Sequence, residues 1–97
     1  MIELAWDPVK NILNQRKHGV SFEEAMTVFF DEEALLEFDE LHSDDEERFR
    51  ILGRSSHGNI LIVVHCFRGE SLIRIISSRK ATLNERKGYE RSLRNGR

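Results

Sequence analysis

Basic and phenolic side chains in the second half of the chain are suited to chemistry on a phosphate. Arg79 and Lys80 directly follow a predicted strand and precede a predicted helix start, where main-chain N–H groups also favour an anion. Arg74 lies five residues earlier, on the opposite strand face from Arg79 if the strand runs on unbroken, and Tyr89 lies two turns into the last helix. Cleaving RNA without a metal requires a base near the 2′-hydroxyl, cations for the charge on the attacked phosphate and an acid for the leaving 5′-oxygen. Arg, Lys, Tyr and His side chains can share these tasks.

The same residues also have a purely structural interpretation, in which Arg79 and Lys80 are an exposed pair at a strand end and Arg74 is a salt-bridge partner. Metal chemistry is not indicated, because the four histidines lack paired ligand spacing and Cys66 has no neighbouring cysteine. The acidic run Asp44-Asp45-Glu46-Glu47 lacks the glycine and the spaced ligands of a calcium loop. Since the chain also has no glycine-rich phosphate loop, we expect no metal and no cofactor.

The charge is divided unevenly along the chain. Residues 1–47 carry 14 acidic and three basic side chains, a net charge of −11, whereas residues 48–97 carry 12 basic and three acidic ones, a net charge of +9. Ten of those 12 bases are Arg, whose planar guanidinium suits bidentate binding of phosphate or carboxylate. Two interpretations stay open: the halves pair with each other across a compact fold, or the basic half faces a polyanion.

Length and composition predict one domain over residues 1–97. The 97 residues, 39% of them hydrophobic and 33% charged, suffice for a modest core. The longest apolar run, residues 60–64, is far too short to span a membrane, and the start of the chain lacks the basic and apolar segments of a signal peptide. A lone Cys66 cannot form an internal disulfide, so we expect a reducing, cytoplasmic setting.

Two helices are predicted in the first third of the chain. Asp7 and Pro8 suit the N-cap and first position of one helix, and Gly19 supplies its left-handed stop. The side chains at helical spacing on one face of this helix are Val9, Ile12, Leu13 and Arg16. A second helix begins at the capping-box sequence of residues 21–24, and its expected buried stripe is Phe22, Ala25, Met26 and Phe29.

The remaining elements are predicted to be strands followed by a helix. Residues 3–6 are a short extended piece, and strands are expected over residues 34–38, 48–54, 60–67 and 72–78, with an acidic turn at residues 39–47. In the second of these strands, Phe49 and Ile51 alternate with Arg48, Arg50 and Arg54, and the third should bury Cys66. A last helix opens at residues 82–85. The expected α+β architecture is two N-terminal helices, an antiparallel meander of three to four strands and a C-terminal helix.

Several strings of the sequence, over about residues 4–90, form a specific set: Trp6-Asp7-Pro8-Val9-Lys10, Asn14-Gln15-Arg16-Lys17-His18-Gly19-Val20-Ser21-Phe22-Glu23-Glu24-Ala25, Glu47-Arg48, Gly53-Arg54, Ile73-Arg74-Ile75-Ile76-Ser77-Ser78-Arg79-Lys80-Ala81, Glu85-Arg86 and Tyr89. With these strings the sequence resembles the BrnT-type toxins of bacterial toxin–antitoxin pairs. Ser78 stands where many relatives have Ala. The family consists of small ribonucleases with a RelE-like fold, so the resemblance implies RNA cleavage that arrests growth. It also implies a cognate BrnA-type antitoxin that carries the DNA-binding part, so that operator DNA is bound only through the antitoxin and the complex represses its own promoter.

The resemblance also gathers Trp6, Asp7, Lys10, Lys17 and His18 into one cluster, although Trp6 as a core anchor and Asp7 as a helix cap have structural explanations. Lys10 and Lys17 lie two turns apart and share a helix face, and the imidazole of His18 is suited to proton exchange or to the helix C-terminus as a cation. The residues expected to take part in catalysis are Lys10, His18, Arg54, Arg74, Arg79, Lys80 and Tyr89. Those expected to bind RNA around them are Lys17, Arg48, Arg50 and Arg86.

Three functions therefore stay open. The first is a metal-independent ribonuclease toxin that inhibits translation. The second is a non-catalytic nucleic-acid-binding protein that uses the basic half only to position phosphates. The third is a toxin-like protein that acts on another target, as gyrase poisons of this general fold do.

Overall fold

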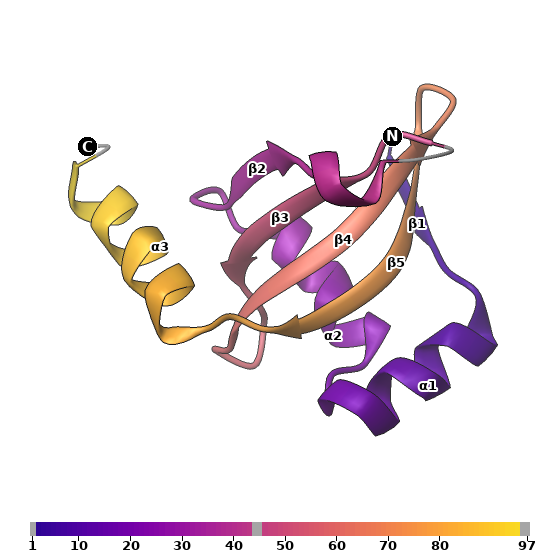
Figure 1. The fold of residues 1–97 in the computed structure, drawn as a ribbon, viewed down its shortest axis with the longest axis horizontal. Coiled ribbons are helices and arrows are strands. Elements are labelled where there is room, and N and C mark those ends of the chain that lie inside the picture. Colours follow the sequence, from indigo (N-terminus) through magenta and orange to yellow (C-terminus); the bar gives the residue numbers. More distant parts are fainter. Residues whose placement is uncertain (1, 44–45, 96–97) are drawn as a thin grey trace.

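The computed structural model describes residues 2–43 and 46–95, which form a five-stranded mixed sheet and helices that pack around it (Figure 1). The strands are β1 (Glu3–Ala5), β2 (Leu35–Phe38), β3 (Phe49–Arg54), β4 (Ile60–Arg68) and β5 (Leu72–Lys80). Their order in the sheet is β1-β5-β4-β3-β2. Strands β2 to β5 form an antiparallel meander, whereas β1 pairs in parallel with β5.

The α+β class is as expected, but the expected RelE-like arrangement with a sheet of three to four antiparallel strands is wrong in two respects. The short piece at the start of the chain is a fifth strand, and it runs parallel to its neighbour. Its three residues are too few for a readable period, and its partner lies at the other end of the chain. Strand β5 also extends two residues further than expected, so that Arg79 and Lys80 belong to the strand itself.

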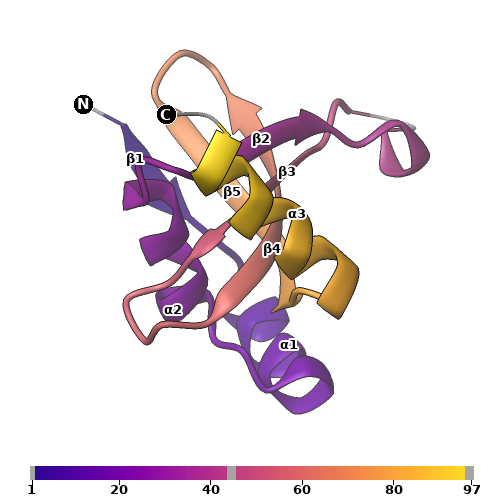
Figure 2. The same ribbon diagram turned by 90° about the vertical axis from the view of Figure 1, so that its left-hand side faces the viewer.

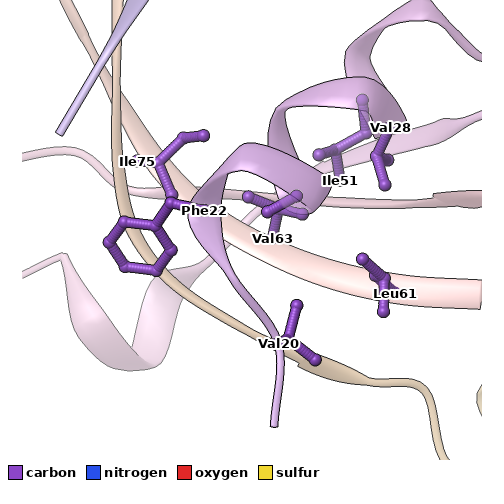
Figure 3. Packing of buried hydrophobic residues seen from close by; sticks show 8 residues of the cluster. Val20, Phe22, Val28, Ile51, Leu61, Val63 and Ile75 are labelled. Carbon is purple, nitrogen blue, oxygen red and sulfur yellow. The ribbon is translucent and has the colours of Figure 1, made fainter. Parts of the chain in front are cut away.

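One face of the sheet is covered by α1 (Pro8–His18), α2 (Phe22–Met26) and the 3-10 helix η1 (Thr27–Phe30). The predicted caps are present: the Asp7 carboxylate accepts from the N–H of Val9, Ser21 Oγ accepts from the N–H of Glu24, and Gly19 ends α1 at φ 70°. Two helices thus lie where they were predicted, but β1 precedes them, and the second ends at Met26 and continues as η1. Beneath them lies the hydrophobic core (Figure 3), whose fully or nearly fully buried members are Val20, Phe22, Ala25, Val28, Ile51, Leu61, Val63 and Ile75.

Helix α1 turns its apolar face away from this core. Val9, Ile12 and Leu13 are each at least half exposed, whereas the buried residues of α1 are Asn11 and Asn14. Asn11 Oδ1 accepts from the N–H of Phe22 at 2.8 Å, and Asn14 hydrogen-bonds to β5. Polar contacts to main-chain groups therefore seat α1 beside the sheet.

The other sheet face carries the 3-10 helix η2 (Glu40–His42), and α3 (Leu83–Asn95) crosses one end of the sheet (Figure 2). Glu85 and Thr82 form the predicted capping box at the start of α3. Part of the predicted acidic turn, Asp44 and Asp45, lies outside the described residues. Within those residues, no helix is long and apolar enough to cross a membrane.

Candidate functional site

Three cations from three elements surround one hollow of about 300 Å³ where α3 meets the end of the sheet. Arg54 comes from the end of β3, Lys80 from the end of β5 and Arg86 from the first turns of α3. We call this the cationic hollow. Its other lining residues are Gly58, Asn59, Ile60, Ala81 and Glu90. In the described part of the chain, no carboxylate forms an ion pair with Lys80 or Arg86, so the hollow is suited to an anion such as a phosphate.

A buried carboxylate holds the β3–β4 turn that forms one wall of this hollow. Glu24 Oε2 accepts hydrogen bonds from Ser55 Oγ at 2.6 Å and from Asn59 Nδ2 at 2.8 Å, while His57 Nδ1 lies 3.3 Å from Glu24 Oε1. Burial on its own would raise the pKa of Glu24, but these hydrogen bonds and the His57 charge together lower it. The ionised carboxylate therefore fixes Asn59 in place at the hollow.

Arg79 is tied to α3 rather than free. Its guanidinium donates to both carboxylate oxygens of Glu85, at 2.8 and 3.0 Å, and Glu85 also accepts from the N–H of Thr82. The Arg79 hydrogen bonds are the largest influence on Glu85 and lower its pKa to about 2, and the same pair raises the pKa of Arg79. This pair aligns the start of α3 with β5 and thereby sets the position of Arg86 relative to Lys80.

Tyr89 anchors the middle of α3. Its ring is buried, and its hydroxyl donates to Asp31 Oδ2 at 2.6 Å, an oxygen that also accepts from the main-chain N–H of Arg54 at 2.8 Å. Burial, followed by the Asp31 carboxylate, raises the pKa of Tyr89 to about 12. The hydroxyl is thus committed to Asp31, and Tyr89 does not line the cationic hollow.

A second hollow lies on the sheet face that carries η2. Its polar lining comes from His18, Asp39, Arg50, Ser77, Ser78 and Arg79. Arg50 is paired with Glu37, so its charge, like that of Arg79, is partly neutralised. Arg79 lines this second hollow, whereas the next residue of β5, Lys80, lines the cationic hollow.

The cations of α1 extend this region. Lys10, Lys17 and His18 line a third hollow between α1 and β5, so the predicted common face of Lys10 and Lys17 is confirmed. His18 lines both this hollow and the second one. Through His18, the hollow that Lys10 and Lys17 line is therefore connected to the hollow that Arg50 and Arg79 line.

Arg74 and Arg48 lie apart from these hollows. Arg74 lines a separate hollow with Trp6, Asp7 and Arg68 at the other end of β5. The register shift between Val64 and His65 leaves an extra residue in β5, so Arg74 pairs with Cys66 and Arg79 with Ile62, and both arginines lie on one face. The strand is therefore not unbroken, and the expected opposite placement is wrong. Arg48 precedes β3, and its main-chain N–H and C=O bond to Ser43 Oγ and to the N–H of Asp39.

The acidic partners of the cations could not be read from the sequence, although the cations themselves could. Glu24, Asp31 and Glu85 position the hollow, yet each acts on a residue that no local pattern connects to it. For Glu85 the capping-box spacing was a usable signal, but its pairing with Arg79 was not visible. Among residues 2–43 and 46–95, no group of three His, Cys, Asp or Glu side chains gathers in a way that would hold a metal ion.

Comparisons with known proteins identify the family to which the chain belongs. A crystal structure of the Brucella abortus ribonuclease toxin BrnT matches with a TM-score of 0.67 and 21% sequence identity, over 84% of this chain and 99% of that chain. At this identity the likeness shows a common fold. No curated protein sequence matches the chain. The family model described as the ribonuclease toxin BrnT of type II toxin–antitoxin systems matches residues 6–85, and the chain therefore belongs to the BrnT toxin family.

Proposed function

We propose that the chain is a toxin that cleaves RNA at the cationic hollow without a metal ion and thereby inhibits translation in the cytoplasm. The observation that carries this proposal is the convergence of Arg54, Lys80 and Arg86 on one hollow that a single carboxylate, Glu90, also lines among the described residues. Such an arrangement binds a phosphodiester and stabilises the extra negative charge that develops during cleavage. The family to which the chain belongs supports a nuclease rather than a gyrase poison.

The proposed chemistry uses two hollows, which Lys80 and Arg79 line as consecutive residues of β5. Attack of a ribose 2′-oxygen on the neighbouring phosphorus breaks the bond to the 5′-oxygen and leaves a 2′,3′-cyclic phosphate and a 5′-hydroxyl. Lys80, Arg86 and Arg54 stabilise the charge on the phosphate oxygens. We assign the proton transfers to His18 of the second hollow, which takes the proton of the 2′-hydroxyl and returns it to the 5′-oxygen, and Lys10 and Lys17 bind the phosphates beyond it.

The decisive experiment is cleavage of a labelled single-stranded RNA by the purified chain in the presence of excess EDTA. Lys80→Ala and Arg86→Ala should each reduce the rate by about 10²–10³-fold, since removal of one donor to a transition-state oxyanion costs that much. Lys87→Ala is the matched control, because Lys87 is an exposed neighbour on α3 that does not line the hollow, and its rate should equal that of the original chain.

The outcomes separate the competing functions. Wild-type rates in folded Lys80→Ala and Arg86→Ala variants would show that the reaction occurs elsewhere. Cleavage that EDTA abolishes would contradict metal independence. Tight RNA binding without any cleavage would instead support the non-catalytic nucleic-acid-binding function.

A type II family implies a cognate antitoxin. We propose a BrnA-type, DNA-binding antitoxin that covers the basic side of the toxin with acidic or apolar groups and represses the shared promoter. The positive charge around the cationic hollow supports this mode, because an exposed phosphate site is blocked best by an anionic or shape-matched cover. The complex should then have no RNase activity, and cleavage at the rate of the free toxin would contradict direct blocking.

A further inference from the structure

Strand β2 is an edge strand that leaves its apolar side chains exposed. It lies at the margin of the sheet with β3 as its neighbour there (Figure 1). Leu35, Leu36 and Phe38 are 38%, 56% and 44% exposed, and Leu41 in the following η2 is 86% exposed. Four large apolar side chains within seven residues form a surface that favours contact with another protein.

The main chain of β2 also offers free pairing groups. The N–H of Asp39 donates to the C=O of Arg48 at 2.8 Å, so the alternation of an antiparallel ladder directs Leu35 and Glu37 toward β3 as well. The N–H and C=O groups of Leu36 and Phe38 then point outward. Exposed edges are commonly protected by proline, lysine or a bulge, and β2 has none of these, although it is only four residues long.

The charge around β2 indicates what kind of strand fits there. Residues 31–47 contain ten acidic side chains and no Lys or Arg. A second copy of β2 would place like charges opposite each other, which is unfavourable. The two sides of the strand also differ: Leu36 and Phe38 share the helix-covered side with Ile51 and Phe49, whereas Glu37 lies on the other side opposite Arg50.

We propose that β2 is a docking edge for an extended segment of another protein in which apolar and basic side chains alternate. The apolar side chains pack beside Phe38. The rings of Phe38 and Phe67 each make an edge-to-face contact with the ring of Phe49, with centroid distances of 5.5 and 5.1 Å. The basic side chains face Glu37 on the opposite side, and the exposed acids at both ends of β2, Glu32 and Glu40, add to the attraction. Main-chain hydrogen bonds to Leu36 and Phe38 supply affinity, and the alternation supplies specificity. This site does not depend on the ribonuclease proposal, because Leu35–Phe38 line neither the cationic hollow nor the hollows of His18.

The test uses a capped nine-residue peptide of alternating Val and Lys, titrated into the full chain and followed by the backbone amide signals in NMR. We expect saturable binding, with shifts centred on β2 and slowed hydrogen exchange at the amides of Leu36 and Phe38. A peptide of alternating Val and Glu should not bind. Since both Glu32 and Glu40 are exposed acids flanking β2, the double variant Glu32→Lys/Glu40→Lys should weaken binding about tenfold.

Matched variants keep the result unambiguous. Glu3→Lys reverses an exposed charge on β1, at the opposite edge of the sheet, and should leave affinity unchanged. Leu36→Pro removes an outward-facing N–H but no ladder donor, and should abolish binding while the sheet remains folded. The proposal is overturned by absence of saturable binding, by shifts centred on another surface, by affinity that the charge reversal does not change, or by dimerisation of the chain itself through β2.

Discussion

The Asn14 side chain makes hydrogen bonds to the main chain of β5 that a neighbouring strand would otherwise make. Its Nδ2 donates to the C=O groups of Ser78 and Val20 at 2.8 and 2.9 Å, and its Oδ1 accepts from the N–H of Ser78 at 3.1 Å. β1 pairs only with residues 72–74, so this amide satisfies the edge of β5 next to Arg79 and Lys80. Asn14 and Ser78 are 64 residues apart, and helical periodicity gave no reason to bury an asparagine of α1. Residue types thus predicted the cations of the site, whereas long-range polar contacts that position them could not be predicted.

His65 is another buried polar residue, and its burial has a measurable consequence for stability. It is fully buried among the rings of Phe29, Phe49 and Phe67, and its Nδ1 lies 3.1 Å from the C=O of Val63. A carbonyl only accepts, so Nδ1 carries the hydrogen, and the buried Nε2 has no hydrogen-bond partner among the described residues. Burial lowers the pKa of His65 below 6.5, which keeps the imidazole neutral in the folded state.

We therefore predict that the free energy of unfolding falls as the pH drops below about 6.5, because the unfolded chain then binds a proton that folded His65 does not. The contribution is fully present above pH 6.5, and the loss below it reaches at most about 1.4 kcal/mol per pH unit. Urea unfolding between pH 5 and 7 should show a shallower pH dependence for His65→Leu than for the original chain. Equal slopes for the two proteins would contradict a neutral buried imidazole.

The elements themselves were largely predictable, because turn and cap residues bound them clearly. Asp7, Gly19 and the capping box of residues 82–85 mark helix ends where the structure has them. Two features were not predicted from the sequence: the parallel pairing of β1 and the extra residue in β5. Both depend on which strands become neighbours, and neither changes the local hydrophobic pattern. The second feature matters for the site, since the extra residue places Arg74 on the same side of the sheet as Arg79.

At this scale, Gly53 and Gly88 should respond in opposite ways to alanine. A Cβ on Gly53 would lie 2.9 Å from Ala34 Cβ and 3.0 Å from Val28 Cγ1, where η1 and the segment leading to β2 press against β3. Gly53→Ala should therefore destabilise the fold by about 1–3 kcal/mol, as overpacking does. Gly88 lies inside α3, and a Cβ there would meet nothing within 4 Å, so Gly88→Ala should stabilise by about 0.5–1 kcal/mol. Thermal and denaturant unfolding of both variants checks the pair, and a destabilised Gly88→Ala would mean that α3 packs more closely than described.

Across the whole molecule, the two oppositely charged halves of the sequence pair only in part. Arg50 and Arg68 form ion pairs with Glu37 and Glu46 of the acidic half, and Arg79 pairs with Glu85 of its own half. Among the described residues, no carboxylate forms an ion pair with Arg54, Lys80 or Arg86, the cations of the cationic hollow. Internal pairing therefore holds for some of the arginines, whereas the polyanion interpretation stays a prediction for the cations of the hollow. The sequence could not assign each arginine because pairing depends on the strand register.

This division makes the salt dependence of RNA binding a test of the whole charge arrangement. If Arg54, Lys80 and Arg86 meet about three phosphates, the affinity for single-stranded RNA should fall with a log–log slope of about −2, since each phosphate contributes about −0.7. A labelled 2′-O-methyl RNA lacks the attacking hydroxyl and allows the intact toxin to be measured by fluorescence anisotropy across a salt series. Lys80→Ala should make the slope shallower by about 0.7, whereas Lys87→Ala should leave it unchanged. A slope near zero for the intact chain would mean that internal ion pairs neutralise the basic half, and the proposed phosphate site would then lose its physical support.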